Sequence, residues 1–166
     1  MPPDVTTVSD SQGSKWTVMV FMGAATIAGN SPLIDAAEAD LEEMRFVGSG
    51  GQLNVFVQVH QGGDVVPRRG RITDSMATGI NGLEPVPEDQ RDARRGLALH
   101  DFIRWALTTA KHNPQNQEHY SLLVLWGHAY DFAIGRAQTT DGMIDALDFA
   151  ELSRVLERLQ IGRAHV

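Results

Sequence analysis

KWTVMVFM, at residues 15–22, is the segment that says most about the architecture of this chain. It is almost continuously apolar and rich in β-branched and aromatic residues, which is typical of a strand buried on both faces of a sheet. Two later stretches share this character, LNVFVQV at residues 53–59 and YSLLVLW at residues 120–126. Because strands of this kind occur mainly in parallel sheets covered by helices, the three stretches predict the core strands of an α/β domain.

Three helical patterns alternate with these strands. The first is predicted to begin at Ser31, a good cap that is followed by proline, and to end at Gly48. The second has its apolar face within residues 99–110. The third is predicted to begin at Asp148, whose carboxylate can cap the helix while Glu151 caps it in return.

The remaining segments are predicted to be irregular or exposed. Residues 65–72 have the pattern of a short hairpin, and residues 79–95, rich in Gly, Pro and charge, of a surface loop. The acidic residues of the first helix are expected to form a solvated helix face. They are Asp35, Glu38, Asp40, Glu42 and Glu43.

This order of elements predicts an open three-layer α/β/α sandwich with a mostly parallel sheet. Residues 1–14 are polar and are expected to form a disordered N-terminal tail, and residues 15–166 a single domain. The third helix should be followed by another core strand, but only a few residues remain after it. We therefore expect the sheet to lack its later core strands and to expose an edge beside the third strand.

Composition excludes several classes of function. The 166 residues include no cysteine, which excludes disulfides, thiolate metal sites and a cysteine nucleophile within them. The net charge is −7, and the basic residues are not concentrated in one segment, so no nucleic-acid surface is expected. No apolar run approaches the ~20 residues that span a bilayer. The first residues do not resemble a secretory signal, which indicates a cytoplasmic protein if Met1 is the true start.

His128 is the most suggestive candidate for a functional residue. Ligands of open parallel sheets bind beyond the carboxyl ends of the strands, where residues 23–30, 60–67 and 127–145 are predicted to form loops. His128 lies two positions after the third strand. An imidazole held there by a rigid strand can act as a general base or proton shuttle, and the alternative is a histidine that only hydrogen-bonds at the strand end.

Other candidate sites have weaker support. Residues 23–30 follow a strand and contain glycines, but they lack the Gly-Lys-Ser/Thr of a phosphate loop and the glycine spacing of a dinucleotide site. No serine lies in a Gly-x-Ser-x-Gly turn. Two groups contain residue types that bind metals, although neither has a known ligand spacing. They are His60 with Asp64, and Asp141 with Asp145 and Asp148.

The sequence resembles a known family over residues 15 to about 160. The segments that carry the resemblance are KWTVMVFM at 15–22, DLEEM at 40–44 with VGS at 47–49, NVFVQV at 54–59, LHDFIRWA at 99–106 and YSLLVLWGH at 120–128. In order and spacing they resemble the N-terminal half of the clostripain-type cysteine peptidases. The resemblance implies that residues 15–166 form part of a caspase-like peptidase domain.

The resemblance also implies roles for three residues. His128 would be the histidine of a Cys-His dyad, assisting thiolate attack on the peptide carbonyl and protonating the leaving amine. Ala129, where the family usually has glycine, would offer its backbone N–H to the oxyanion, although alanine resists the positive φ that glycine accepts. Arg136 is the candidate processing site, because family members are often cut in a loop between the histidine and cysteine strands.

In that family the substrates are polypeptides with Arg or Lys at P1. The nucleophilic cysteine and the acidic group that pairs with P1 lie on the next core strand, after the third helix. The chain is therefore expected to be inactive alone and to need the C-terminal half of its domain as a partner. No cofactor is expected to be required, and calcium dependence, which occurs in the family, has no assignable site in this sequence.

Two alternatives remain open from the sequence. A caspase-like interaction module without catalytic activity would retain the fold and lack the nucleophile. A flavodoxin-like domain that binds a small ligand rests on fold analogy alone. The DNA that follows the Val166 codon distinguishes the interaction module from a peptidase. An encoded apolar strand that ends in Asp-x-Cys would support the peptidase. A stop codon would support the module.

Overall fold

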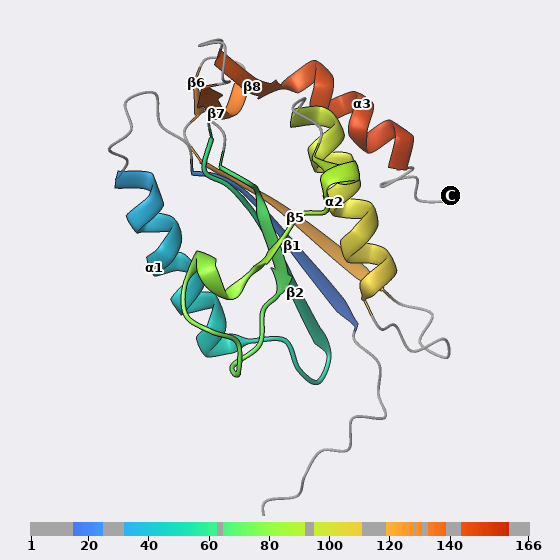
Figure 1. Ribbon diagram of the computed structural model, residues 1–166. Helices are drawn as coiled ribbons and strands as arrows, with labels where there is room; N and C mark the ends of the chain where they lie inside the picture. Colours follow the sequence, from blue (N-terminus) through green and yellow to red (C-terminus); the bar gives the residue numbers. More distant parts are fainter. Residues whose placement is uncertain are drawn as a thin grey trace, which may run out of the picture.

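The computed structural model has two sheets and three α-helices in the residues that it describes (Figure 1). These residues are 15–24, 32–62, 65–91, 95–110, 119–127, 129–130, 133–138 and 144–159. The predictions on residues 1–14, and those on Ser31, Asp64, His128 and Asp141, lie outside these ranges. Within them the protein is a mixed α/β fold with helices on both faces of its main sheet, which confirms the predicted architecture.

The main sheet has five strands among the described residues, in the order β4-β3-β2-β1-β5. β1 (Trp16–Gly23), β2 (Leu53–His60) and β5 (Tyr120–Gly127) are parallel, with β1 between the other two. β3 (Arg68–Arg71) and β4 (Glu84–Pro85) extend the β2 side with antiparallel pairing. The three predicted core strands are confirmed, and they form the parallel part of the sheet.

The parallel strands pair without a break in register. Trp16 lies opposite Leu53 and Tyr120 at the amino ends, and Gly23 lies opposite His60 and Gly127 at the carboxyl ends. Each strand contributes eight residues to this block. The three carboxyl ends therefore finish at one straight edge of the sheet.

Alternating side chains of the strands build two apolar cores, one on each face. α1 (Pro32–Val47) covers one face, where Ala37 and Leu41 pack with Val20, Met22 and Val57. α2 (Arg95–Thr109) and α3 (Phe149–Leu159) cover the opposite face (Figure 1). The residues of that second core include Met19, Phe21, Phe56, Leu99, Phe102, Ile103 and Val155.

The helix ends follow the sequence signals. α1 ends before Gly48, whose N–H donates to the carbonyl of Met44 at 2.9 Å. At the start of α3, Asp148 Oδ1 accepts from the N–H of Glu151 at 2.6 Å, and Glu151 Oε2 accepts from the N–H of Asp148 at 3.3 Å. This reciprocal pair confirms the capping box predicted at Asp148.

The segment from residue 65 to residue 95 differs from its prediction. The predicted hairpin at 65–72 instead contributes β3, which pairs with β2 and β4. In its described residues, the predicted surface loop at 79–95 contains two short 3-10 helices, η1 (Ile80–Gly82) and η2 (Glu88–Gln90), and three buried apolar side chains. Ile80, Leu83 and Val86 are each at most 2% exposed. The prediction of a surface loop was wrong. The Gly, Pro and charged residues suggested exposure, but these apolar residues recur at every third position among them and are buried.

The predicted loop at 127–145 also contains regular structure. β6 (Ala129–Tyr130), β7 (Ala133–Gln138) and β8 (Ile144–Asp148) form an antiparallel sheet with β7 in the centre. This small sheet lies at the carboxyl edge of the main sheet, where β7 contacts β1 and β5 (Figure 1). Its strands are short and carry few β-branched residues, so the sequence gives only a weak strand signal.

β5 is less buried than its apolar sequence predicts. Among the described residues it pairs with β1 on one side and with no strand on the other. Leu122 is 48% exposed, whereas Val57 on β2 is fully buried. The edge expected beside the third strand is therefore present in the described part of the chain.

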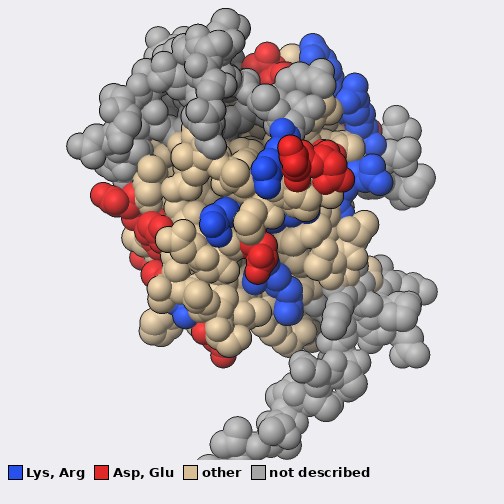
Figure 2. Space-filling model, in the orientation of Figure 1, with Lys and Arg blue, Asp and Glu red and all other residues tan. Residues whose placement is uncertain are grey.

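The described surface carries charges of both signs. Figure 2 shows acidic side chains along the left margin, where α1 lies, basic side chains at the upper right, and both signs mixed on the face between them. Among the described helices, none combines the length and the hydrophobicity that crossing a bilayer would need.

Candidate functional site

The carboxyl edge of the main sheet brings three strand ends together. Gly23 of β1 lies between His60 of β2 and Gly127 of β5 in the register of the sheet. The N–H of Ala24, just after β1, donates to the carbonyl of His60 at 2.9 Å. Gly23 and Ala24 are buried at the centre of this edge, where β7 of the small sheet contacts β1 and β5.

Gly127 has a backbone conformation that favours glycine. Its φ is +146°, in a region that residues with a Cβ rarely adopt. Gly127 directly precedes His128 in the sequence, and the placement of His128 itself lies outside the described residues. The conformation at Gly127 therefore marks the point where the chain leaves the strand toward the candidate histidine.

His60 is held at the β2 end by two neighbours on the α2 face. Its Nε2 lies 2.8 Å from Nε2 of Gln58, two residues earlier on the same strand. The ring also contacts Phe21 of β1, with 4.8 Å between ring centroids and a tilt of 45°. His60 is half-buried, so its ring is fixed by the strand and still lies at the edge.

Arg69 is a buried cation one strand farther from the centre of the edge. It lies on β3 opposite Gln58 and is 6% exposed. The guanidinium stacks over Trp105 of α2 at 4.5 Å, and its Nη2 donates to Gln90 Oε1 at 2.7 Å. Burial lowers the pKa of Arg69, and the charges of Asp101 and Asp89 raise it. The residue remains charged, because an arginine in a protein is not deprotonated.

The other two residues of the predicted site lie in the small sheet. The backbone of Ala129 begins β6 and pairs with Ile134 of β7. The backbone of Arg136 lies in β7, in the stretch where the β7–β8 register shifts between Ile134 and Ala137. Arg136, predicted to lie in a loop, is therefore part of a central strand, at an irregularity of its ladder.

Each of the two candidate metal sites includes residues outside the described ranges. Within the described ranges, no cluster of three or more His, Cys, Asp or Glu side chains could hold a metal ion. Asp64 and Asp141 lie outside those ranges, and Asp148 caps α3. Nothing in the described residues therefore supports either of the two candidate metal sites.

Sequence reasoning missed Gln58 and Arg69 as residues beside the edge. Each leaves a signal that could have revealed it: Gln58 interrupts the apolar run of β2, and Arg69 is one of three arginines in four residues. A polar residue that is 2% exposed within a core strand, as Gln58 is, needs a partner on its own face. The partner must therefore lie on the face that α2 covers, where the side chains of Arg69 and His60 also lie.

The chain is similar to a solved structure, although its sequence matches no family model. No family model and no curated protein matches the sequence. Among solved structures, the chain is similar to a B. fragilis cysteine protease, with 22% sequence identity and a TM-score of 0.42. The match covers 72% of this chain and 92% of that chain.

Proposed function

We propose that this chain is the histidine-bearing part of a clostripain-like cysteine endopeptidase that cleaves peptide bonds after Arg or Lys. His128 would be the catalytic histidine, and the nucleophilic cysteine would come from polypeptide outside these 166 residues, which contain none. The proposal rests on the sequence resemblance and on the arrangement of the carboxyl edge.

One observation carries the proposal. The β1–β5 register brings Gly127, the residue before His128, beside Gly23 at the centre of the carboxyl edge. Active sites of open parallel sheets lie at this edge. The φ of Gly127 explains why glycine suits the position immediately before the histidine.

The chemistry assigned to His128 is acid–base catalysis. As a base it would take the proton of a cysteine thiol, so that the thiolate attacks the carbonyl carbon of the scissile bond. As an acid it would give that proton to the leaving amine. The backbone N–H of Ala129 would stabilise the oxyanion, and such preorganised donors supply a large share of catalysis in acyl transfer.

The free side of β5 is where we place the strand that carries the cysteine. Among the described residues no strand pairs there, and residues 121–127 contain no charged side chain that would keep another strand away. A parallel strand on that side would end beside Gly127. Its last residues would then be adjacent to the residue that follows Gly127.

Processing at Arg136 and calcium dependence remain parts of the proposal that rest on the resemblance. Cleavage at Arg136 would require β7 to leave its ladder locally, because a peptidase binds an extended and accessible segment. The register shift beside Arg136 makes β7 weaker there than in a continuous ladder.

An interaction module without catalytic activity is the second candidate function. The observation in its favour is the absence of cysteine from the sequence. The DNA that follows the Val166 codon distinguishes the two functions. An in-frame apolar strand that ends in Asp-x-Cys supports the peptidase, and an in-frame stop codon supports the module.

The isolated chain gives a second test. We expect no turnover of a fluorogenic peptide with Arg at P1, because the chain lacks the nucleophile. Clear turnover that is lost in His128→Ala would contradict the proposal of a nucleophile outside this chain.

A further inference from the structure

A row of three polar side chains leads from β3 to the carboxyl edge beneath α2. Arg69 lies directly opposite Gln58 in the β2–β3 pair, so both side chains project from the same face. His60 follows Gln58 by two residues on β2 and shares that face. Arg69 is 6% and Gln58 2% exposed, so water screens this row poorly.

The contact between Gln58 and His60 determines which ring nitrogen carries a proton. Gln58 Nε2 lies 2.8 Å from His60 Nε2. An amide nitrogen only donates, so the histidine nitrogen must accept. A neutral imidazole whose Nε2 accepts carries its proton on Nδ1.

The opposite orientation of the Gln58 amide would reverse this assignment. It would present Oε1 to His60 and require the proton on Nε2, while turning the NH₂ group away from the histidine. In the orientation found, Gln58 Oε1 and Arg69 Nη1 are both buried and have no hydrogen-bond partner among the described residues. A cation opposite the amide attracts its oxygen and repels its NH₂ group, so the charge of Arg69 favours the orientation found.

Arg69 can exert this effect because it is itself fixed. Trp105 lies against the face of its guanidinium, and Gln90 accepts a hydrogen bond from Nη2. The carboxylates of Asp101 and Asp89 are close enough to interact with its charge. The cation therefore stays beneath α2 and cannot swing into solvent.

We propose that Arg69, acting through Gln58, is a positioning residue that fixes His60 as the neutral Nδ1–H tautomer at the carboxyl edge. His60 then presents a fixed N–H donor, and its only lone pair is occupied by Gln58. This arrangement leaves acid–base chemistry to His128 and makes His60 unsuitable as a metal ligand. The inference depends on the proposed function only in treating the carboxyl edge as an active site. The assignment of the His60 tautomer does not depend on the proposed function.

The direct test is the tautomer of His60, read from the ¹⁵N shifts of the ring in the labelled full chain at neutral pH. We expect a protonated Nδ1 and an unprotonated Nε2. In Gln58→Glu the carboxylate can only accept, so the proton should move to Nε2. A His60 ring protonated on Nε2 in the unmodified chain, or unchanged in Gln58→Glu, would overturn the proposal.

The role of Arg69 needs its own variants. Arg69→Met removes the charge and keeps most of the length, and should give a mixture of the two tautomers, whereas Arg69→Lys should retain Nδ1–H. Arg71→Met is the matched control, because Arg71 lies two residues along on the same face of β3 and bonds Asn54 instead. Equal spectra for Arg69→Met and Arg71→Met would contradict the proposal. If Arg69→Met does not fold, the spectrum of Gln58→Glu still tests the assigned tautomer of His60. Neither measurement requires peptidase activity.

Discussion

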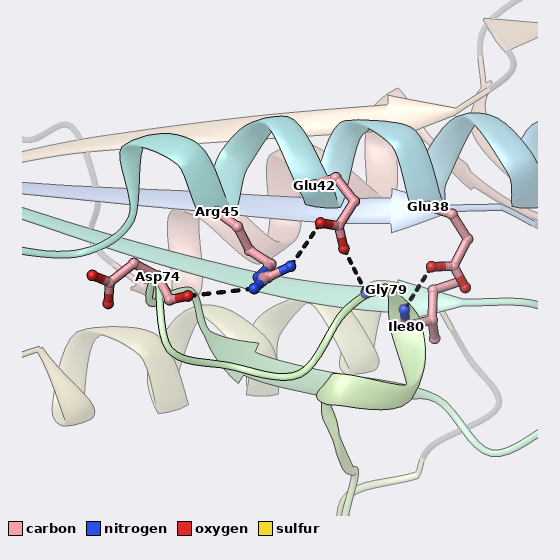
Figure 3. A network of polar contacts seen from close by, with 6 residues as sticks. All are labelled: Glu38, Glu42, Arg45, Asp74, Gly79 and Ile80. Atoms are coloured by element: carbon pink, nitrogen blue, oxygen red, sulfur yellow. Dashed lines mark hydrogen bonds and ion pairs between the residues drawn. The ribbon is translucent and has the colours of Figure 1, made fainter.

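The Glu38 carboxylate accepts a hydrogen bond from the backbone N–H of Ile80 at 2.9 Å, across 42 residues of sequence. One turn farther along α1, Glu42 Oε1 accepts from the N–H of Gly79 at 2.9 Å (Figure 3). Arg45 continues the network, because it binds Glu42 at 2.6 Å and the carbonyl of Asp74 at 3.3 Å. The acidic face of α1, expected to be solvated, therefore holds residues 74–80 on the helix.

Glu38→Ala should lower the free energy of unfolding by about 1–2 kcal/mol, because it removes a charged acceptor from a partly buried N–H. Hydrogen exchange of the Ile80 amide should become faster in the same variant. Glu43→Ala is the control, since Glu43 is exposed on the same helix, and it should change stability by less than about 0.5 kcal/mol. Equal effects of the two substitutions would show that the Glu38 bond contributes nothing.

Gly79→Ala should destabilise the protein by about 1–3 kcal/mol for two reasons. Gly79 has φ of +65°, and a Cβ at this position would overlap the Glu38 carboxylate. Because the second effect depends on the Glu38 side chain, the double variant with Glu38→Ala should lose less stability than the sum of the two single variants. Strict additivity in denaturant unfolding would mean that Glu38 does not contact this position.

Asp40→Ala should loosen the attachment of β5 to α1. Asp40 Oδ2 accepts a hydrogen bond from Trp126 Nε1 at 2.6 Å, so its loss should cost about 1–2 kcal/mol and shift tryptophan emission to the red. Asp40→Asn keeps an acceptor and should recover most of the stability. If the asparagine and alanine variants unfold alike, this hydrogen bond is not what stabilises the pair.

The free side of β5 should make the isolated chain associate. Light scattering at micromolar concentrations should show species larger than a monomer, and Leu122→Lys should reduce them, because a charge on an edge strand opposes pairing. Val65→Lys adds the same charge at an exposed position away from β5 and should leave association unchanged. A monomeric, cooperatively unfolding chain would contradict this prediction.

The parts of the fold that the sequence predicts are those with strong local signals. The parallel strands stand out because a strand covered on both faces must be apolar at almost every position, as residues 18–22 are. The start of α3 stands out because the capping box depends on two residues, Asp148 and Glu151, at a fixed spacing. Both signals act within a few residues, so tertiary context does not override them.

The parts that the sequence does not predict depend on partners far along the chain. The local sequence predicts that Glu38 is solvated, because its hydrogen-bond partner Ile80 is 42 residues away. The burial of Ile80, Leu83 and Val86 depends on packing against other elements, which their glycine- and proline-rich segment does not indicate. Gln58 and Arg69 become neighbours only through the antiparallel register of β2 and β3. The location of His128 just after a predicted strand marks it as a candidate. The same reasoning does not reveal the row formed by Arg69, Gln58 and His60 beside the edge.

We propose that His128 is the catalytic histidine of a peptidase whose cysteine lies outside this chain. The measurement that tests this role is cleavage of a peptide with Arg at P1 by this chain produced together with the polypeptide encoded after Val166. His119 is the matched control, because it precedes β5 at the amino edge just as His128 follows it at the carboxyl edge. We predict turnover that His128→Ala abolishes and His119→Ala retains. Turnover that survives His128→Ala would contradict the claim.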